Sequence, residues 1–425
     1  MDSTKQFADE YIDQVREATD LADLIGHSVT LKRTGGDFLG LCPFHNDTRP
    51  SFRVNVSQRR YRCWSCPAKG DAFAWLMNTQ YVTFPEAVKI LAGRAGIPLP
   101  APSVDSAEDR ARKRRLSRSY AVLSDAQRLY ASGLKSAPDA LRYLREERGL
   151  ADETIQAFGL GAVRSGIWRY LSHRDDVDAL LAAGILGLRD DQSLYERFRH
   201  RITFPIRNVR GAVIGFGGRL YFARRDDAPK YLNSPETELY QKHRELYALD
   251  LARQPICRAS LAIVVEGYLD VVSLHQAGET RAVAPLGTAI SEHQVRRLLG
   301  LADEICFVFD GDGAGRRAAL AAAKVVLGEI PDGKRASFAY LQDGEDPDSL
   351  VRSGGIERWN EVLESRLPLS TVLTTFVAGQ KALDVPENLV SAHDRAREVL
   401  KAIQRANVFR RAMQLAFEER LGLAL

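Results

Sequence analysis

The sequence has no run of about 18 consecutive apolar residues, which is the length that a membrane-spanning helix needs. Cysteine is scarce, with five residues in a chain of 425, and this excludes a disulfide-stabilised scaffold. The first residues, MDSTKQFADEYIDQ, are polar and acidic, unlike a secretory signal. Internal repeats and long low-complexity tracts are also absent. These absences predict a cytoplasmic protein, and the length of 425 residues predicts about three globular domains.

Basic residues are concentrated in two segments, although the net charge of the chain is only +4. Residues 195–245 carry eleven Lys and Arg against six Asp and Glu, and residues 110–118 (RARKRRLSR) carry six basic residues and no acidic one. Basic surfaces attract polyanions and bind phosphate backbones. Either segment alone would be interpreted as a solvated surface or a flexible linker.

The first part of the chain predicts a small unit followed by a linker. Residues 1–98 begin with a helical pattern over residues 7–24, pass through a stretch with Gly and Cys, and end in an apolar helix around residues 84–91. The stretch PLPAPSVDSAEDRARKRR then combines three prolines with small and charged residues. This composition predicts a basic linker at residues 99–118.

The remaining sequence predicts three further segments. Residues 119–255 begin with helices and continue into short β-like runs, RITFPI and GAVIGFGGRLYF. Residues 256–350 alternate buried strands with helices, which predicts a mostly parallel sheet covered by helices. Residues 351–425 have a helical pattern throughout. The expected fold class is therefore a multidomain protein that combines α+β and α/β units.

Two residue pairs in the first segment have the spacing of a zinc site. CPFH supplies Cys42 and His45, and CWSC follows after seventeen intervening residues with Cys63 and Cys66. Two such pairs on tight turns suit a closed, tetrahedral, structural zinc site, and their coincidence disfavours four incidental residues. The intervening SFRVNV and RRYRC predict the strands of a zinc ribbon. We expect zinc to hold together a unit with little core of its own.

Acidic residues follow three of the strands expected in residues 256–350. The motifs VVEGYLD, FVFDGDGAG and YLQDGEDPD contribute Glu266 and Asp270, Asp310 and Asp312, and Asp346 and Asp348, respectively. Functional residues of open α/β sheets gather where strands end and loops begin. We therefore expect these carboxylates to meet in space.

Carboxylates that converge in this way repel one another unless cations lie between them. Oxygen ligands select Mg²⁺ or Mn²⁺, and two such ions can activate an attacking hydroxyl and stabilise a leaving phosphate. A single DxD turn is more often a helix cap or a solvated loop. The recurrence of acids after three strands favours the metal site.

The acidic motifs EGYLD, DGDGAGRRAA and DGEDPD, in this order and spacing, resemble the Toprim fold that bacterial primases, topoisomerases and some nucleases share. CPFHNDTRPSF followed by YRCWSCPAKGDAFAWL resembles the zinc-binding domain of DnaG-type primases. RFRHRITFPIRNVRGAVIGFGGR and PKYLNSPET resemble the basic half of the primase polymerase core. With KHRELYAL, the resemblance to the bacterial DnaG-type DNA primase family extends nearly unbroken from residue 41 to about residue 368.

The resemblance implies roles for individual residues. Glu266, Asp310 and Asp312 match positions implicated in catalysis, and with Asp346 and Asp348 they match the metal-binding positions. Asp270 lies close to them in the sequence. The positions implicated in holding nucleotide or template are Arg148, Arg219, Lys230, Tyr231, Asn233 and Lys242.

The resemblance also implies cofactors and partners. It implies one structural zinc ion, two or more catalytic Mg²⁺ or Mn²⁺ ions, a single-stranded DNA template, ribonucleoside triphosphates and an RNA primer as product. We expect a monomer. The family also has a replicative helicase as partner, but we expect the domain that usually binds it to be absent, because the chain ends where that domain would begin. Pro67 stands where the family usually has a glycine, and the loop at residues 220–228 is slightly long.

Two alternative functions stay open at this point. A Toprim nuclease or topoisomerase would use the same metals. A topoisomerase also needs a tyrosine nucleophile on a strand-passage domain, and no motif in the sequence indicates one. A non-catalytic zinc-ribbon protein that binds single-stranded DNA is the second alternative. The intact set of acids argues against it.

Overall fold

The computed structural model describes residues 7–44, 47–66, 68–79, 82–100, 107–171, 176–221, 229–287, 289–379 and 382–425. The chain forms two compact units, Met1–Ala111 and Arg112–Leu425. Among the described helices, none combines the length and the apolar character that crossing a membrane requires. His45 and Pro67, two residues of the zinc motif, lie outside the described residues.

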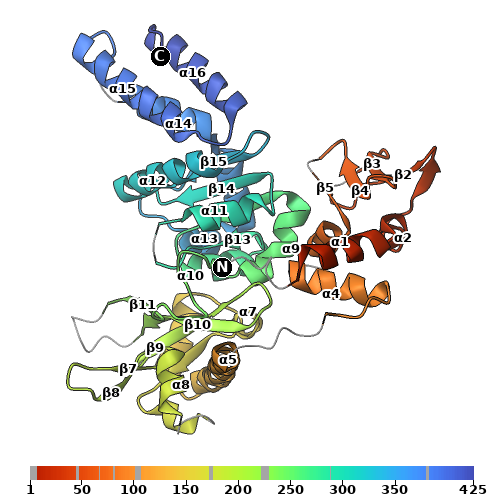
Figure 1. The fold of residues 1–425 in the computed structure, drawn as a ribbon. Helices are drawn as coiled ribbons and strands as arrows, with labels where there is room; N and C mark the ends of the chain where they lie inside the picture. The colour runs from red at the N-terminus through yellow and green to blue at the C-terminus, as the bar shows by residue number, and fades with distance from the viewer. Residues whose placement is uncertain are drawn as a thin grey trace. The chain divides into compact units, whose positions relative to one another are not determined.

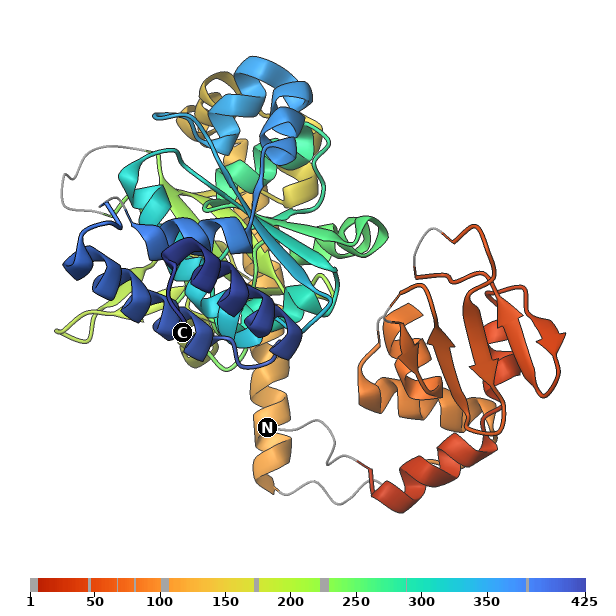
Figure 2. The same ribbon diagram turned by 90° about the horizontal axis from the view of Figure 1, so that it is seen from above.

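The first unit packs helices beside an antiparallel sheet (Figure 2). The strands follow one another in the sheet in chain order and are β1 Lys32–Thr34, β2 Asp37–Gly40, β3 Phe52–Asn55, β4 Arg60–Cys63 and β5 Lys69–Gly70. The helices are α1 Asp9–Ala18, α2 Leu21–Gly26, α3 Ala72–Thr79 and α4 Phe84–Arg94. The helix expected over residues 7–24 is thus two helices, because the Asp20 side chain accepts hydrogen bonds from the backbone N–H groups of Ala22 and Asp23 and begins a new helix.

The first unit has a larger core than the sequence led us to expect. The rings of Phe52 and Tyr61 stack with their centroids 5.3 Å apart, and Trp75 meets Tyr61 edge-on at 5.6 Å. These three side chains are at most 2% exposed. Each fully buried side chain of this size contributes roughly 1.5–3 kcal/mol of hydrophobic stabilisation. The expectation of a unit with little core of its own is therefore wrong, because α3 and α4 supply the apolar side chains that cover the ribbon.

The segment expected as a linker at residues 99–118 is helical in its second half. Helix α5 (Ala107–Leu134) begins within it and includes the whole basic run 110–118. After the last proline the sequence contains strong helix formers, and Glu108 and Asp109 lie in the first turn, where the helix dipole favours negative charge. Arg112 and Arg115 pair with Glu238, so part of the basic run is used to hold α5 in the second unit.

The second unit begins with a mixed helical and antiparallel part. Its strands are β6 Gly161–Val163, β7 Leu186–Leu188, β8 Leu194–Glu196, β9 Arg201–Arg207, β10 Val213–Leu220 and β11 Tyr231–Asn233. Its helices after α5 are α6 Pro138–Arg142, the π-helix η2 Tyr143–Glu147, α7 Asp152–Phe158, the 3-10 helix η3 Ile167–Tyr170 and α8 Val177–Ala182. The main sheet has the order β11-β10-β9-β6, and the expected runs RITFPI and GAVIGFGGRLYF form its central strands β9 and β10.

A mostly parallel sheet forms the centre of the second unit (Figure 1). Its strands are β12 Leu261–Val264, β13 Ala282–Val283, β14 Glu304–Phe309, β15 Arg335–Tyr340 and β16 Leu367–Pro368. The order is β13-β12-β14-β15-β16, in which the first four are parallel and β16 is antiparallel to β15. The accompanying helices are α9 Leu249–Ala259, α10 Tyr268–Gln276, α11 Glu292–Leu299, α12 Gly313–Glu329 and α13 Pro347–Glu364. The expected alternation of strands and helices is confirmed, and Cys306 is buried in β14 as a core residue.

Helices complete the chain after the short strand β16. They are α14 Leu369–Ala378, α15 Pro386–Ala402 and α16 Asn407–Leu421. Leu373 of α14 and Phe417 of α16 belong to the same apolar cluster as Phe307 and Phe338 of the parallel sheet. The expected fold class, α+β and α/β units in one chain, is confirmed.

Candidate functional site

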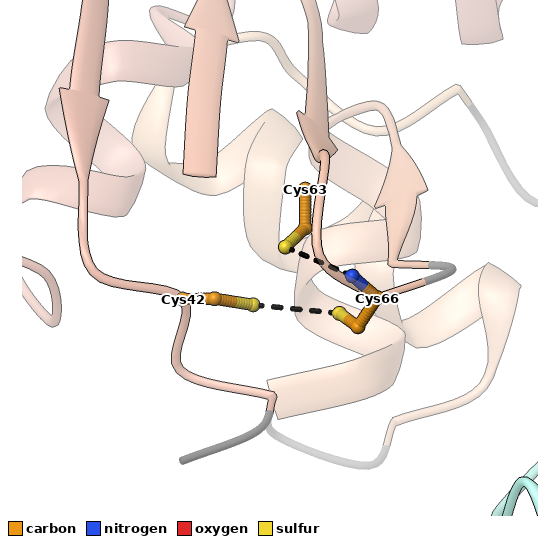
Figure 3. A group of neighbouring side chains, drawn as sticks. All are labelled: Cys42, Cys63 and Cys66. Carbon is orange, nitrogen blue, oxygen red and sulfur yellow. Dashed lines mark hydrogen bonds between the residues drawn. The ribbon is translucent and has the colours of Figure 1, made fainter. Parts of the chain in front are cut away.

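Three cysteine side chains of the first unit meet between the turn after β2 and the turn after β4 (Figure 3). The Sγ atoms of Cys42 and Cys66 are 3.7 Å apart, and the three sulfur atoms of Cys42, Cys63 and Cys66 all lie within 4.8 Å of one another. A tetrahedral zinc ion with Zn–S bonds of about 2.3 Å separates its sulfur ligands by about 3.8 Å. The three thiols therefore have the spacing of a zinc site without a disulfide between them.

Hydrogen bonds around the sulfur of Cys63 favour the thiolate that binds zinc. Burial raises the pKa of Cys63, but hydrogen bonds from the Ser51 hydroxyl and from the backbone N–H groups of Ser65 and Cys66 outweigh it, so that the pKa is lower than that of an ordinary thiol. Asp47 orders the opposite turn, because its Oδ2 accepts a hydrogen bond from the Cys42 backbone N–H at 2.8 Å. The donor set fits a structural zinc ion.

Acidic side chains of the second unit gather at the carboxyl ends of the parallel strands. Glu266 follows β12, Asp310 directly follows β14, and Asp346 lies in the loop between β15 and α13. Because β12, β14 and β15 are parallel neighbours, their carboxyl ends lie at one edge of the sheet. After burial, which is the larger cause, Asp310 raises the pKa of Glu266 and Asp346 raises that of Asp310, so the acids of the three loops lie close enough to repel one another.

Helix caps hold three of the six acids in place. Asp270 accepts a hydrogen bond from the Gly267 backbone N–H at 2.9 Å, and Asp312 accepts one from Gly315 at 2.7 Å. Asp346 accepts one from the Ser349 backbone N–H at 2.7 Å. Each cap uses one carboxylate oxygen and leaves the other for a metal ion. The same acid can therefore be both a helix cap and a metal ligand.

Two glycines of the DGDGAG motif allow the loop after β14 to lie against its neighbours. A Cβ atom on Gly311 would lie 2.1 Å from the carbonyl oxygen of Leu341, and one on Gly315 would lie 2.1 Å from that of Asp310. Neither distance is sterically allowed, so both positions require glycine. The close approach at Gly311 brings the loop after β14 to the loop after β15, and that at Gly315 keeps the loop after β14 tightly turned.

The acids raise one another's pKa. Burial raises the pKa of Asp270 to about 7, with further increases from Asp346, Asp348 and Asp310, although its hydrogen bond from Gly267 lowers it. Burial and the neighbouring acids also raise the pKa of Glu266 and of Asp310. Divalent cations relieve such repulsion, and carboxylate oxygens are the ligands that Mg²⁺ and Mn²⁺ prefer. The donor set fits those ions.

The acids lie farther apart than the cysteines. In the described part of the chain, the cysteines are the one group in which three ligand atoms lie within 4.8 Å of one another. A site for two ions about 3.5–4 Å apart requires a wider spread of ligands than a single zinc ion does. The two groups of ligands therefore suit different metals.

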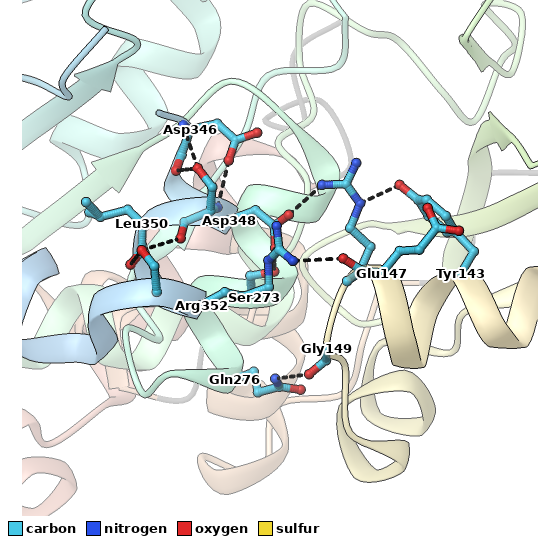
Figure 4. Close-up of polar contacts among 12 residues, drawn as sticks. Tyr143, Glu147, Gly149, Ser273, Gln276, Asp346, Asp348, Leu350 and Arg352 are labelled. Atoms are coloured by element: carbon cyan, nitrogen blue, oxygen red, sulfur yellow. Dashed lines mark hydrogen bonds and ion pairs between the residues drawn. The ribbon is translucent and has the colours of Figure 1, made fainter. Parts of the chain in front are cut away.

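Asp348 differs from the other acids because its carboxylate is held by protein groups. It is 1% exposed, and its Oδ2 accepts a hydrogen bond from Nη1 of Arg148 at 2.6 Å. Its Oδ1 accepts a hydrogen bond from the Ser273 hydroxyl at 2.6 Å and lies 3.3 Å from Nε of Arg352. Figure 4 shows Asp348 and Ser273 on one side of this network and Tyr143 on the other. The Arg148–Asp348 pair thus joins the parallel-sheet part of the unit to the part that precedes it.

Four of the six expected nucleotide or template residues, Arg148, Arg219, Tyr231 and Asn233, form a group next to the acids. Arg219 of β10 donates from Nη1 to the Tyr231 hydroxyl at 2.9 Å, and Tyr231 of β11 is close enough to Asp270 for that acid to raise its pKa, although burial is the larger cause. The amide of Asn233 accepts a hydrogen bond from the Tyr268 hydroxyl at 2.7 Å and donates to the carbonyl oxygen of Leu286 at 2.9 Å. Strand β11 therefore connects the basic part to the acidic edge.

Lys230 and Lys242 are placed by their backbones. The carbonyl oxygen of Lys230 accepts hydrogen bonds from Arg201 and from the Leu220 N–H, and the Lys242 N–H donates to Glu236. Within the described residues, neither lysine side chain has a hydrogen bond or ion pair with the acids or with the arginines of this group. Their roles stay a prediction.

The sequence interpretation did not identify Tyr143, Tyr268 or Ser273. Tyr143 contacts both Arg148 and Arg219, Tyr268 holds Asn233, and Ser273 holds Asp348. Tyrosines and serines in helical stretches are ordinary in sequence. Their importance comes from neighbours that are distant along the chain.

Comparison with known proteins agrees with this architecture. Three family models match the chain: CHC2 zinc finger over residues 7–106, DNA primase catalytic core, N-terminal domain, over residues 129–253, and Toprim domain over residues 260–339. A DNA primase of Pseudomonas aeruginosa is 43% identical over 353 residues, which cover 81% of this chain and 53% of that protein. The chain thus spans about half the length of that curated relative.

Two solved structures extend the likeness to three dimensions. A DnaG primase catalytic domain bound to ssDNA is 35% identical with a TM-score of 0.67, and the match covers 74% of this chain and 98% of that one. The zinc-binding and RNA polymerase domains of the Aquifex aeolicus primase are 29% identical with a TM-score of 0.63, and the match covers 97% of each chain. The fold and the site residues define a protein that combines a zinc ribbon with a Toprim domain. The chain belongs to the bacterial DnaG-type DNA primase family.

Family membership bears on the predicted cofactors. The zinc finger match and the three clustered thiols confirm zinc as the structural metal of the first unit. The Toprim match agrees with the predicted use of Mg²⁺ or Mn²⁺ at the acidic edge. The match to the primase catalytic core favours a primase over the Toprim nuclease, the topoisomerase and the non-catalytic alternative.

Proposed function

We propose that this chain is a DNA-directed RNA polymerase that synthesises short RNA primers on single-stranded DNA. The observation that carries the proposal is the placement of mutually repelling carboxylates from three strand ends beside a group of arginines and tyrosines in the same unit. Negative and positive groups at this spacing suit a substrate that is itself a metal-bound polyphosphate. Family membership supports the same activity.

The acids have distinct tasks in this proposal. Glu266, Asp310 and Asp312 lie at the ends of β12 and β14 and are the catalytic carboxylates, and Asp346 and Asp270 complete the set that holds the ions. Asp348 adds its charge while its oxygens hold Arg148, Arg352 and Ser273. Two bound Mg²⁺ or Mn²⁺ ions would activate the attacking 3′-hydroxyl and stabilise the leaving pyrophosphate.

The basic and aromatic residues bind and orient the substrates. Arg148 and Arg219 present guanidinium N–H groups to phosphate oxygens, for which their planar fork is well suited. Tyr231 and Asn233 place the edge of β11 against the acidic loops. Lys230 and Lys242 add positive charge along the path of the template, which a phosphate backbone requires.

The nucleic-acid substrate is single-stranded DNA. A related catalytic domain was solved bound to ssDNA, and the segment 195–245 of this chain carries the excess of basic residues noted above. The first unit would add template contacts through its zinc ribbon, where Arg62 lies over the ring of the exposed Trp64 with 4.3 Å between guanidinium carbon and ring centroid. Exposed aromatic and basic side chains of this kind bind single strands by stacking and phosphate contact.

The test is primer synthesis by the full chain on a mixed-sequence single-stranded DNA, with ribonucleoside triphosphates and Mg²⁺. We expect short RNA products and pyrophosphate in the wild type, and neither in the Asp310→Asn variant. The matched control is Asp303→Asn, which removes an acid at the opposite end of the same strand, where Asp303 pairs with Lys334 at 2.9 Å.

Three outcomes would contradict the proposal. Cleavage of the DNA without RNA synthesis would identify a nuclease. Tight DNA binding with neither reaction would identify a binding protein. Full synthesis in Asp310→Asn would show that the acidic edge is not the catalytic centre.

A further inference from the structure

Tyr143 lies between two guanidinium groups next to the acidic edge. Its ring centroid is 4.7 Å from the guanidinium carbon of Arg219 and 5.3 Å from that of Arg148. Its hydroxyl oxygen accepts a hydrogen bond from Nε of Arg148. The residue is 8% exposed, and burial raises the pKa of its phenol, so the hydroxyl is neutral at physiological pH. One side chain thus contacts both arginines that the proposed function assigns to the polyphosphate.

The π-helix η2 brings Tyr143 and Arg148 together. Its backbone N–H to C=O bonds span five residues, and the Arg148 N–H donates to the Tyr143 carbonyl at 3.0 Å. In an α-helix of 3.6 residues per turn, side chains five positions apart would lie about 140° from each other around the axis. A π-helical turn brings them close to the same side, and such turns occur often at functional sites. The π-helical backbone therefore allows the side chains of Tyr143 and Arg148 to contact each other.

The two arginines differ in how their charge is balanced. Arg148 forms an ion pair with the buried Asp348. Arg219 forms no ion pair among the described residues, and its Nε is buried without a hydrogen-bond partner. A partly buried cation with an unsatisfied N–H is costly unless a ligand completes it. The ring of Tyr143 keeps this cation beside Arg148, and the two together suit an anion with several phosphate groups.

We propose that Tyr143 is a positioning residue for the nucleotide: it holds Arg148 by its hydroxyl and Arg219 by its ring, so that both guanidinium groups meet the same triphosphate. This inference rests on the proposed function for the reaction, but it concerns the binding of a Mg²⁺–nucleoside triphosphate, which is measurable without polymerisation. Tyr143 touches no reacting atom in this assignment. Its substitution should therefore weaken binding more than it slows the chemical step.

The experiment compares Tyr143→Phe and Tyr143→Leu with the wild type in two assays. Steady-state primer synthesis at saturating template gives kcat and the KM for nucleotide, and fluorescence anisotropy of a labelled ATP with Mg²⁺ gives Kd without template. Tyr143→Phe loses one hydrogen bond to a charged group, and we expect KM and Kd to rise about 3- to 10-fold with kcat within about twofold. Tyr143→Leu also loses the ring, and we expect a loss of about 30- to 100-fold in kcat/KM.

The matched control is Tyr120→Phe on helix α5. It removes a hydroxyl that accepts a hydrogen bond from the Asn208 side chain at 3.4 Å. We expect no change in KM or Kd for this variant. Melting temperatures of all variants, measured by circular dichroism, separate local from global effects. If Tyr143→Leu does not fold, Tyr143→Phe alone decides, because it retains the packing of the ring.

Two results would overturn the inference. One is an unchanged Kd and KM in Tyr143→Phe. The other is a loss of kcat with unchanged Kd, which would make Tyr143 part of the chemical step. If the wild type synthesises no RNA but binds Mg²⁺–ATP, and Tyr143→Phe weakens that binding, the polymerase proposal fails while the positioning role stands.

Discussion

The cysteine cluster of the first unit and the acidic edge of the second prepare ligands for cations in two different ways. The thiols come from two turns within residues 42–66, and two of the sulfur atoms are already 3.7 Å apart. The acids come from three loops between residues 266 and 348 and are held in part by the helices that begin beside them. One site is assembled by a local hairpin of strands, and the other by the topology of a whole sheet.

The two sites also differ in how they affect the stability of the protein when no metal is bound. A thiol can stay protonated and neutral, and burial raises the pKa of Cys42 and Cys66 accordingly. The acids at the sheet edge are carboxylates, and burial together with their mutual repulsion raises the pKa of Glu266, Asp310 and Asp270. The zinc site should therefore contribute to stability, whereas the acidic edge reduces stability in return for reactivity.

Neutralising one acid gives the largest expected effect and tests this contrast directly. Asp310→Asn should lower primer synthesis by at least about a thousandfold, because one carboxylate of the ion-binding set is lost. The same change should leave the melting temperature unchanged or higher without Mg²⁺, because it removes repulsion with Asp346 and Asp312. Primer assays and thermal melts of one preparation check both parts. A variant that is inactive because it is less stable would contradict the contrast.

Removal of a zinc ligand should, in contrast, lower the stability of the first unit. Cys63→Ser should reduce the zinc content from about one ion per chain to none and lower the melting transition of the first unit by about 10–20 °C, while the second unit melts as before. The aromatic core should keep the transition cooperative. Metal analysis and calorimetry measure these changes. Cys257→Ser, on helix α9, is the control, and this variant should still contain one zinc ion per chain. A first unit that stays equally stable without zinc would refute the prediction.

The stability of the second unit should depend on pH through Asp270. The pKa of Asp270 is about 7 in the folded chain, and an unfolded aspartate has a pKa of about 3.9. The folded state therefore binds the proton more tightly, and stability falls as pH rises from about 4 to 7. Asp270→Asn, studied with a chelator, should be more stable than the wild type by up to about 4 kcal/mol at pH 8 and by little at pH 4.

Urea unfolding of Asp270→Asn across this pH range is the measurement, repeated with saturating Mg²⁺. Mg²⁺ should reduce the gain, because the cation relieves the same repulsion in the wild type. The control is Asp250→Asn, since burial raises the pKa of Asp250 in helix α9 as well. Its gain should not respond to Mg²⁺. An Mg²⁺ response in both variants, or in neither, would count against the assignment.

A smaller effect should follow from weakening one helix cap. Ser349→Ala removes the hydroxyl that accepts a hydrogen bond from the Asp346 N–H, at a cost of about 0.5–1.5 kcal/mol in the free energy of unfolding. Primer synthesis should fall by less than about fivefold, because the Ser349 backbone N–H still holds Asp346. Ser353→Ala, one turn further along α13, is the control for stability. A loss of activity as large as that of Asp310→Asn would show that the cap does more than orient Asp346.

Much of the architecture was readable in the sequence because its signals are local. The strands β12, β14 and β15 are short apolar runs, and the acids follow them directly in the chain. The rule that parallel strands end at one edge of a sheet then sufficed to predict their meeting. The thiol cluster was predicted in the same way from the spacing of Cys42, Cys63 and Cys66.

Other features depend on contacts between distant segments and could not be predicted. The core of the first unit comes from α3 and α4, whose apolar residues look in sequence like those of any helix. Helix α5 begins at Ala107, within the expected linker, and there Arg112 and Arg115 pair with Glu238 more than 120 residues away. Asp348 is buried against Arg148, which lies 200 residues away in sequence.

The kinds of ligands, their order and the strands that carry them follow from the sequence alone, because each is a pattern of neighbouring residues. The packing of the second unit set which acid is held in a buried ion pair. It also decided that one tyrosine contacts two arginines from different elements. The physical reason is that burial, pKa and cation–ring contacts depend on distances in space, and these are set only when the sheets and helices pack.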